Sequence, residues 1–296
     1  MTTTASTSTP ASASTTASTS TTASAAGALD GHHALVTGGG SGIGLATARA
    51  LVADGATVTL VGRSGVKLGD AADALGTPGR VRTAVADVDD EASLFGAIDS
   101  ANQQAPLTMA IANAGTGGAG PILAMDLEEW ERVLRTNLTG AFLTIKHAAT
   151  KITANGGGTI CAISSIAGTH THRFMSSYTT SKAGLNMLVR NAADELGSLG
   201  VRVNAVAPGI VETELSAALQ ATEDVDADYR RNMPLGRRGL PDDIAAAVRF
   251  LVGPESSWIT GAILPVDGGN HLRRGPNIDP LLTPFIADLP PLSATP

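Results

Sequence analysis

From Asp30 onward, short apolar runs of strand length alternate with longer amphipathic stretches of helix length. Such regular alternation is typical of a parallel sheet, because helices connect the strands and cover both faces. The predicted strands are 33–36, 57–61, 80–84, 109–112, 159–163, 202–206 and 262–266. The predicted helices are 43–54, 68–75, 91–101, 127–150, 177–199 and 242–251. We therefore expect a doubly wound α/β fold, a seven-stranded parallel sheet in a single domain over residues 30–270.

The two ends of the chain differ from this pattern. Residues 1–26 are Ser, Thr or Ala except for Met1 and Pro10, and residues 1–29 contain no charged side chain. Such a segment has too few large apolar side chains to offset the entropy lost on ordering. We expect 1–29 to be a disordered tail, or the result of a start codon placed too early. Residues 271–296 contain six prolines, which predicts a tail that is extended over the domain or a neighbouring subunit, or disordered.

Composition excludes several classes of protein. The net charge of −7 argues against a nucleic-acid binder, which needs clustered Lys and Arg. Cys161 is the only cysteine, so an intramolecular disulfide framework and a Cys-rich zinc site are excluded, and we expect it to be a small buried core residue. No apolar run approaches the roughly 18 residues that span a bilayer. The simplest expectation is a soluble, cytoplasmic protein without a membrane partner.

The first predicted strand runs directly into Thr37-Gly-Gly-Gly-Ser-Gly-Ile-Gly44, and a helix follows. This context, strand then glycine turn then helix, is that of a dinucleotide-binding Rossmann fold. Glycines let the backbone approach a pyrophosphate, and the helix N-terminus offers free N–H groups to the phosphates. The alternative is a glycine turn that only tightens the corner between strand and helix.

The end of the second strand bears on the choice of dinucleotide. An acidic residue there would bind the ribose hydroxyls of NAD, but this chain has Gly62 followed by Arg63. A guanidinium can hold a 2′-phosphate through two parallel hydrogen bonds. We therefore predict NADP, with NAD as the second choice. Arg63 could instead be a surface residue, and the glycine loop adds only Ser41, with no second basic residue.

Tyr178 and Lys182 are four residues apart, a spacing that places both on one face of a helix. An ammonium near a phenol stabilises the phenolate, so we expect the pKa of Tyr178 to fall from about 10 and the residue to act as an acid or base. Alone, such a pair is more often a solvated helix face.

Three further polar residues accompany this pair. Ser165 and Asn113 follow two of the predicted strands, and chemistry gathers at the carboxyl ends of strands in a doubly wound sheet. Asn137 lies inside the predicted helix 127–150. It is either a buried amide with its hydrogen bonds satisfied or part of a proton path.

With these residues in place, the chain resembles a classical short-chain dehydrogenase/reductase over about residues 35–269. The extended members of that group have a different glycine spacing and a larger C-terminal domain. The matching motifs are Thr37-Gly-x-x-x-Gly42-x-Gly44, Asp87-Val88, Asn113-Ala-Gly115, Asn137, Ser165, Tyr178-x-x-x-Lys182, Pro208-Gly209 with Thr213, Thr260-Gly261 and Val266-Asp-Gly-Gly269.

The resemblance implies roles for these residues. Tyr178 exchanges a proton with the substrate oxygen, and Ser165 hydrogen-bonds the reacting carbonyl. Lys182 lowers the pKa of Tyr178 and holds the nicotinamide ribose, and Asn137 supports a water that links Lys182 to solvent. Hydride passes directly between nicotinamide and carbon, so no metal is expected.

The resemblance also implies a set of cofactor-binding residues. Asp87 and Val88 meet the adenine ring, and residues 208–213 flank the nicotinamide. The full set is Gly38, Ser41, Gly42, Ile43, Gly44, Arg63, Asp87, Val88, Asn113, Tyr178, Lys182, Pro208, Gly209, Val211 and Thr213.

Loops above the site determine specificity in this fold. The stretch 166–177 contains His170 and His172, which line the pocket or lie on the surface, and Phe174 and Met175, which suit an apolar substrate. The stretch 214–240 is long enough to be a lid, and we expect its acidic part, 223–228, to be a solvated helix face. The expected substrate is a secondary alcohol or ketone of alicyclic, steroid-like or polyketide type.

Two other functions stay open. A 3-oxoacyl-thioester reductase acting on acyl carrier protein or CoA would need a basic docking surface; residues 152–158 have no basic residue, and Arg132, Arg135, Lys146 and Lys151 remain as candidates. A non-catalytic NADP-binding redox sensor is the other. The resemblance further implies a homo-oligomer, a tetramer or alternatively a dimer.

Overall fold

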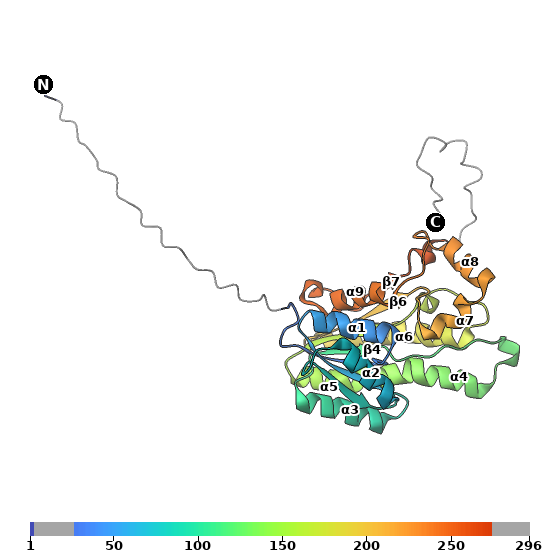
Figure 1. Ribbon diagram of the computed structural model, residues 1–296, viewed down its shortest axis with the longest axis horizontal. Coiled ribbons are helices and arrows are strands. Elements are labelled where there is room, and N and C mark those ends of the chain that lie inside the picture. Colours follow the sequence, from blue (N-terminus) through green and yellow to red (C-terminus); the bar gives the residue numbers. More distant parts are fainter. Residues whose placement is uncertain (3–26, 274–296) are drawn as a thin grey trace.

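The computed structural model describes residues 1–2 and 27–273, which form one seven-stranded parallel sheet with helices on both faces (Figure 1). The strand order is β3-β2-β1-β4-β5-β6-β7. Each predicted strand is present, with bounds that differ by at most two residues. The strands are β1 His33–Thr37, β2 Thr57–Gly62, β3 Val81–Val85, β4 Met109–Ala112, β5 Gly158–Ile163, β6 Val201–Pro208 and β7 Ile263–Val266. The predicted doubly wound Rossmann fold is confirmed.

The helices agree with the sequence pattern except in two places. The predicted range 127–150 is helical throughout, but it is not one regular helix, because a π-helical turn at Arg135–Thr139 divides it into α4 and α5. The stretch 214–240 contains a short helix that was not predicted, α7, and a helix, α8, that includes the acidic part 223–228 expected to be a helix face. The helices are α1 Gly42–Ala53, α2 Gly65–Leu75, α3 Glu91–Gln104, α4 Leu127–Leu134, α5 Gly140–Ala154, α6 Ser176–Gly197, α7 Ala217–Gln220, α8 Glu223–Asn232 and α9 Pro241–Val252.

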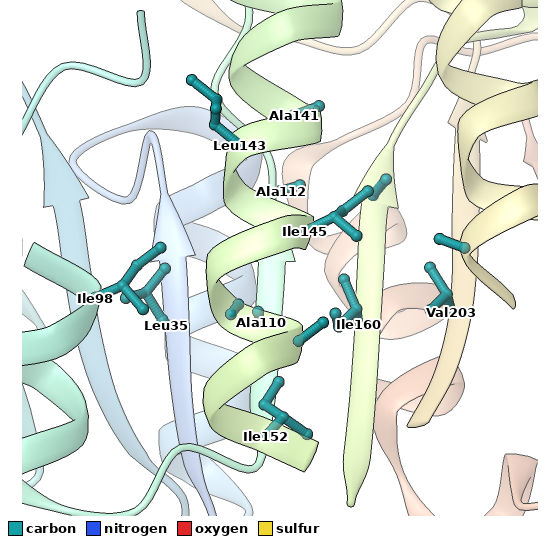
Figure 2. Packing of buried hydrophobic residues seen from close by; sticks show 14 of the residues in the cluster. Leu35, Ile98, Ala110, Ala112, Ala141, Leu143, Ile145, Ile152, Ile160 and Val203 are labelled. Carbon is teal, nitrogen blue, oxygen red and sulfur yellow. The ribbon is translucent and has the colours of Figure 1, made fainter. Parts of the chain in front are cut away.

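Each face of the sheet has its own hydrophobic core. One core packs α1, α2 and α9 against the strands, and the other packs α3, α5 and α6. Figure 2 shows the second core, where Ile145 and Ile152 of α5 lie over Ala110 of β4 and Ile160 of β5. All four are almost fully buried, and burial of each isoleucine contributes roughly 1.5–3 kcal/mol. These two cores hold the sheet rigid beneath its carboxyl edge.

The packed domain begins slightly before the expected boundary at residue 30. Leu29 is fully buried in the core beside α1, and its N–H donates to the Asp54 carbonyl at 2.9 Å. Its one large apolar side chain explains why this residue is ordered although the segment before it is Ser/Thr/Ala-rich. The tails predicted at 1–29 and 271–296 otherwise fall largely on residues 3–26 and 274–296, outside the described part of the chain. Cys161 is buried in the core, as predicted.

The strand order locates the region where a ligand can bind. β1 pairs with both β2 and β4, so the chain winds away from β1 in opposite directions and leaves a crevice at the carboxyl ends of these strands. Within the described residues, no helix combines the length and apolarity needed to cross a membrane. Across the same residues, His, Cys, Asp and Glu side chains form no group that could hold a metal ion.

Candidate active site

The turn between β1 and α1 leaves backbone N–H groups open at the crevice. Gly38 and Gly42 have φ angles of +64° and +51°, which side chains other than glycine adopt only with strain. A Cβ on Gly44 would lie 2.6 Å from the Asn113 amide nitrogen and would also collide with the Gly38 carbonyl. The N-cap residue of α1, Ser41, makes no side-chain hydrogen bond to the helix. A helix N-terminus of this kind attracts phosphate, so the turn fits a dinucleotide pyrophosphate.

Asn113 fixes this turn to the end of β4. Its side-chain amide donates to the carbonyls of Thr37 at 2.8 Å and Gly38 at 3.2 Å. Its own N–H donates to the Thr37 hydroxyl at 3.0 Å. The amide therefore supports the glycine turn from below, in addition to lying at the crevice.

Ser165, Tyr178 and Lys182 converge from β5 and α6. Ser165 lies two residues after β5. Its hydroxyl accepts from the Ala167 N–H at 3.1 Å and donates to the Pro208 carbonyl at 3.5 Å, and it lies near enough to the Tyr178 phenol to lower the pKa of that group. Lys182 is almost fully buried, its Nζ donates to the Ile163 carbonyl at 2.9 Å, and Nζ lies 5.8 Å from the centroid of the Tyr178 ring. The predicted one-face arrangement of Tyr178 and Lys182 is therefore present.

Burial controls the protonation of both groups. It raises the pKa of Tyr178, and the Ser165 hydroxyl offsets this only in part. Burial lowers the pKa of Lys182 to about 8. The expectation that the Tyr178 pKa falls is wrong for the protein as it stands, because removing the phenolate from water costs more than its neighbours return.

Asn137 lies in the π-helical turn that divides α4 from α5. Its Oδ1 accepts from the Thr116 N–H at 2.7 Å, and its Nδ2 donates to the Thr116 carbonyl at 2.9 Å and the Ser181 hydroxyl at 3.1 Å. The Ser181 hydroxyl in turn donates to the Tyr178 carbonyl at 2.7 Å. Asn137 is thus a buried amide with its bonds satisfied, and it ties the loop after β4 to the helix that bears Tyr178. π turns occur often at functional sites.

These elements enclose one cavity of about 310 Å³ at the carboxyl edge of the sheet. Most of the site residues predicted from the sequence line this cavity. Those at its lining are Gly38, Ser41, Gly42, Ile43, Asn113, Ser165, Tyr178, Lys182, Pro208, Gly209, Val211 and Thr213.

Comparison with known proteins identifies the group to which this arrangement belongs. Residues 38–271 match the family model described as enoyl-(acyl carrier protein) reductase. The structure of a short-chain type dehydrogenase/reductase from Mycobacterium ulcerans superimposes with a TM-score of 0.80 at 38% identity, over 87% of this chain and 96% of that chain. This chain belongs to the short-chain dehydrogenase/reductase family.

Some of its relatives are named as dehydrogenases of alcohols, and others as 3-oxoacyl-[acyl-carrier-protein] reductases. The chain is 40% identical to galactitol 2-dehydrogenase (L-tagatose-forming) from Cereibacter sphaeroides, over 81% of this chain and 95% of the relative. It is 42% identical to cis-4-hydroxycyclohexanecarboxylate dehydrogenase from Sinomonas cyclohexanicum, over 80% and 95%. A structure described as an NAD(P)-dependent gluconate 5-dehydrogenase from Beutenbergia cavernae, with NADP at low occupancy, matches at 33% identity and a TM-score of 0.79, over 82% and 98%. This short-chain dehydrogenase is an NAD(P)-dependent oxidoreductase that acts on CH–OH groups.

Five predicted site residues of this dehydrogenase lie outside the cavity lining: Gly44, Arg63, Asp87, Val88 and Asn137. Arg63 is mostly exposed, and its guanidinium lies 4.0 Å from the Asp87 carboxylate. Val88 is buried, and a Cβ on Gly140 would lie 2.8 Å from it, so its side chain packs on the start of α5. Arg63 and Asp87 thus flank the crevice beyond the ends of β2 and β3.

Sequence reasoning missed one basic residue beside the glycine turn. Lys67 lies in the first turn of α2, and a Cβ on Gly40 would be 3.4 Å from the Lys67 Cβ. Its ammonium pairs with the Glu214 carboxylate at 3.0 Å. A second basic residue was considered only within the glycine loop, which has none, whereas Lys67 follows Arg63 by four residues on the next helix.

Both loops above the site contribute side chains to the cavity lining, but not all of the residues expected there. In the stretch 166–177, His172 and Met175 line the cavity and Phe174 does not; Phe174 is half exposed, and the Arg173 guanidinium lies over its ring at 4.5 Å. His170 is also absent from the lining. In the stretch 214–240, Leu215, Leu219 and Tyr229 line the cavity.

The expectation that 223–228 is wholly a solvated face is wrong at Asp226. This carboxylate is buried, receives the Arg238 Nε at 2.5 Å and also pairs with Arg230. The Arg238 hydrogen bond is the largest cause that lowers the Asp226 pKa. The charge run of α8 therefore turns one acidic residue inward, against the segment that follows the helix.

Proposed function

We propose that this enzyme interconverts a secondary alcohol and its ketone with Tyr178 as the acid and base, supported by Ser165, Lys182 and Asn137. The observation on which this rests is the convergence of Ser165, Tyr178 and Lys182 on one cavity beside a glycine turn that fits a dinucleotide. When bound, the nicotinamide of the cofactor supplies or accepts the hydride.

The protein groups supply the proton. A phenol whose pKa is raised by burial keeps its proton at neutral pH, so Tyr178 can donate it to a carbonyl oxygen as that oxygen gains charge. The Ser165 hydroxyl is placed to hydrogen-bond the same oxygen and stabilise the developing charge. Lys182, with a pKa of about 8, holds a proton at pH 7 that it can release toward the phenol with little cost.

The test is reduction of a ketone panel with NADPH, followed by the absorbance of the reduced cofactor. Tyr178→Phe should lower kcat by at least about 100-fold, the usual contribution of an acid–base group, with little change in the Kd of NADPH. Thr180→Ala is the matched control, since Thr180 is exposed on the same helix. Unchanged turnover in Tyr178→Phe would refute the assigned role, and a wild type that binds NADPH but turns over no ketone or alcohol would favour the redox sensor.

NADP is the proposed cofactor, with NAD as the second choice. Gly62 ends β2 where an acidic residue would favour NAD, and two cations, Arg63 and Lys67, flank the adjoining crevice. Arg63→Ala should weaken NADP binding by about 10-fold or more, since a hydrogen-bonded charge pair contributes roughly 1.5–3 kcal/mol, and leave NAD binding unchanged. Arg49→Ala, an exposed residue of α1 paired with Asp242, is the control. Equal NADP affinity in Arg63→Ala and wild type would remove the reason for choosing NADP.

The proposed substrate is an alicyclic, steroid-like or polyketide-type alcohol or ketone. Ile166, Met175, Leu215 and Leu219 give the cavity an apolar wall on the side of the two specificity loops. Such a wall favours a carbocycle over a heavily hydrated chain. The relatives named for galactitol and for a hydroxycyclohexane acid support an alcohol substrate of moderate size.

The similarity to 3-oxoacyl-[acyl-carrier-protein] reductase FabG from Aquifex aeolicus, 36% identical over 81% of this chain and 98% of the relative, favours one alternative, a 3-oxoacyl-thioester reductase. Docking of an acidic carrier protein needs unpaired basic side chains. Each candidate cation instead has an acidic partner: Arg132 with Glu129, Arg135 with Glu131, Lys146 with Glu91 and Lys151 with Asp99. Comparing acetoacetyl-CoA with a free cyclic ketone distinguishes the two: a higher kcat/KM for the thioester would favour the alternative.

We also propose that the enzyme is cytoplasmic and assembles with copies of itself, as a tetramer or alternatively a dimer. Phe142 on α5 and Met187 on α6 are about half exposed, which supports pairing of these helices between subunits. Sedimentation analysis of wild type and Phe142→Glu tests this, because a charge at a subunit contact should dissociate the assembly.

A further inference from the structure

The chain has two tyrosines, and both line the same cavity. Tyr178 belongs to the acid–base site, whereas Tyr229 comes from α8, in the stretch predicted to be a lid. Tyr229 is half buried, and within residues 27–273 its hydroxyl makes no hydrogen bond to protein. A phenol that is partly desolvated and lacks a protein partner gains most from a hydrogen bond to a ligand.

Ion pairs on both sides of Tyr229 hold α8 over the cavity. Asp226, three residues earlier and buried, pairs with Arg230 on its own helix and with Arg238 beyond it at 2.5 Å. Arg238 also lies 3.5 Å from the Glu212 carboxylate, in the segment that follows β6 and borders the cavity. A buried charge paired on both oxygens fixes a helix more firmly than an exposed pair does. The Tyr229 ring is therefore presented at the cavity by an anchored helix.

The charges around the cavity indicate what kind of group Tyr229 can bind. Among the described lining residues the formal charges are those of Lys182 and Glu214. Lys182 donates to the Ile163 carbonyl, and Glu214 is paired with Lys67. The lid side of the cavity otherwise offers apolar side chains and the hydroxyls of Ser216 and Tyr229, and His172 lies on the neighbouring loop. The Ser216 hydroxyl already donates to the Val211 carbonyl. A carboxylate at that end would lack a guanidinium or ammonium partner, whereas a hydroxyl or carbonyl group needs only a neutral hydrogen bond.

We propose that Tyr229 is a substrate-binding residue whose hydroxyl hydrogen-bonds an uncharged second oxygen of the substrate, remote from the reacting carbon. The preferred substrates are then cyclic ketones or alcohols with an additional hydroxyl or keto group, and unsubstituted rings are weaker ligands. This inference rests on the proposed alcohol and ketone function of the same cavity and adds the part of the substrate that the enzyme selects.

The test measures binding separately from turnover. The enzyme saturated with NADP⁺ can neither reduce a ketone nor oxidise a tertiary alcohol. Calorimetry therefore gives the Kd of matched pairs whose added hydroxyl is tertiary: 4-methylcyclohexanone with 4-hydroxy-4-methylcyclohexanone, and 2-decalone with 4a-hydroxy-2-decalone. Wild type should bind the hydroxylated member of at least one pair about 5- to 10-fold more tightly, as one neutral hydrogen bond allows. Tyr229→Phe should bind both members of that pair equally.

Arg231→Ala is the matched control, because Arg231 lies on the same helix with an exposed side chain. It should keep the wild-type preference for the hydroxylated ketone. The inference is overturned if wild type shows no preference in either pair, binds no ketone at all, or shows a preference that survives in Tyr229→Phe. Turnover with NADPH separates this outcome from failure of the proposed function. If wild type and Tyr229→Phe each reduce both ketones of a pair with equal kcat/KM, the inference alone is refuted. If wild type turns over no ketone, the proposed function is refuted.

Discussion

The buried ammonium of Lys182 should make this enzyme less stable at neutral pH than at alkaline pH. Burial lowers the Lys182 pKa from its ordinary 10.5 to about 8. This displacement of about 2.5 pH units corresponds to about 3 kcal/mol, at roughly 1.4 kcal/mol per unit. The unfolded chain holds the proton more tightly than the folded chain does. The free energy of unfolding therefore rises with pH between 8 and 10.5, and at pH 7 the full cost is present.

Comparing wild type with Lys182→Met isolates this contribution. Methionine has a similar length without a charge, and the loss of the hydrogen bond to Ile163 is independent of pH. The free energy of unfolding of wild type minus that of Lys182→Met should therefore rise by about 2–3 kcal/mol from pH 7 to pH 10. Other groups that titrate in this range are present in both proteins and cancel in the difference.

Urea unfolding at fixed protein concentration, at intervals of half a pH unit, measures this difference. Lys182→Met should lose nearly all activity at every pH. A difference in stability that stays constant from pH 7 to 10, or that falls as the pH rises, would show that the folded protein does not hold Lys182 in a desolvated, charged form, and the argument for its role as a ready proton donor would fail with it.

Three further substitutions test other parts of the site. Gly44→Ala should abolish cofactor binding and lower the melting temperature, since the new methyl collides with the Gly38 carbonyl. Gly96→Ala, whose methyl would meet no atom within 4 Å, should instead stabilise α3 by about 0.5–1 kcal/mol in thermal unfolding. Equal melting temperatures for the two variants would contradict this. Asn137→Ala leaves the Thr116 backbone and the Ser181 hydroxyl without their partner and should cost about 1–3 kcal/mol of stability in urea, together with a lower kcat; a loss of neither would mean that the amide does not hold the loop. Asp226→Asn should raise hydrogen exchange in α8 at least about tenfold at pH 7 while α9 is unchanged, and because the Asp226 pKa is lowered, the wild-type helix should lose this support only as the pH falls below about 4; exchange that is alike in both proteins would argue against the ion pairs as an anchor.

The sheet could be predicted from the sequence because its strands are buried on both faces. Runs such as 109–112 and 159–163 are continuously apolar, and few folds other than a covered parallel sheet produce that pattern when helices lie between the runs. The glycine turn and the Tyr178–Lys182 pair could also be predicted, because each depends only on residues close together in the sequence. Four residues separate two side chains on one helix face, and the glycines lie between one strand and the next helix. These features are local, and a sequence shows local features directly.

The parts that the sequence did not reveal depend on contacts between distant residues. Tyr229 lines the cavity and Lys67 lies beside Gly40 only because of how α8 and α2 pack in the folded chain, and no periodicity near either residue indicates this. Asp226 lies in an acidic run that looks solvated, yet Arg238, twelve residues later, draws it inward. The lowered pKa predicted for Tyr178 failed for the same reason: the spacing to Lys182 was right, but the depth of burial, which decides the direction, is a property of the whole fold.

The π-helical turn at Arg135–Thr139 shows most directly how the site departs from regular structure. An apolar pattern over 127–150 predicts one helix, because a single extra residue in a turn leaves composition and most spacings unchanged. That extra residue changes which side chains of α4 and α5 share a face, and Asn137 lies in the turn itself. In this turn the Asn137 amide hydrogen-bonds both polar atoms of the Thr116 backbone and the Ser181 hydroxyl. A regular helix over the same residues would place this side chain differently. The irregular turn, the buried ammonium of Lys182 and the left-handed glycines each cost stability by themselves. They occur together around one cavity, and locally unfavourable features of this kind are typical of functional sites.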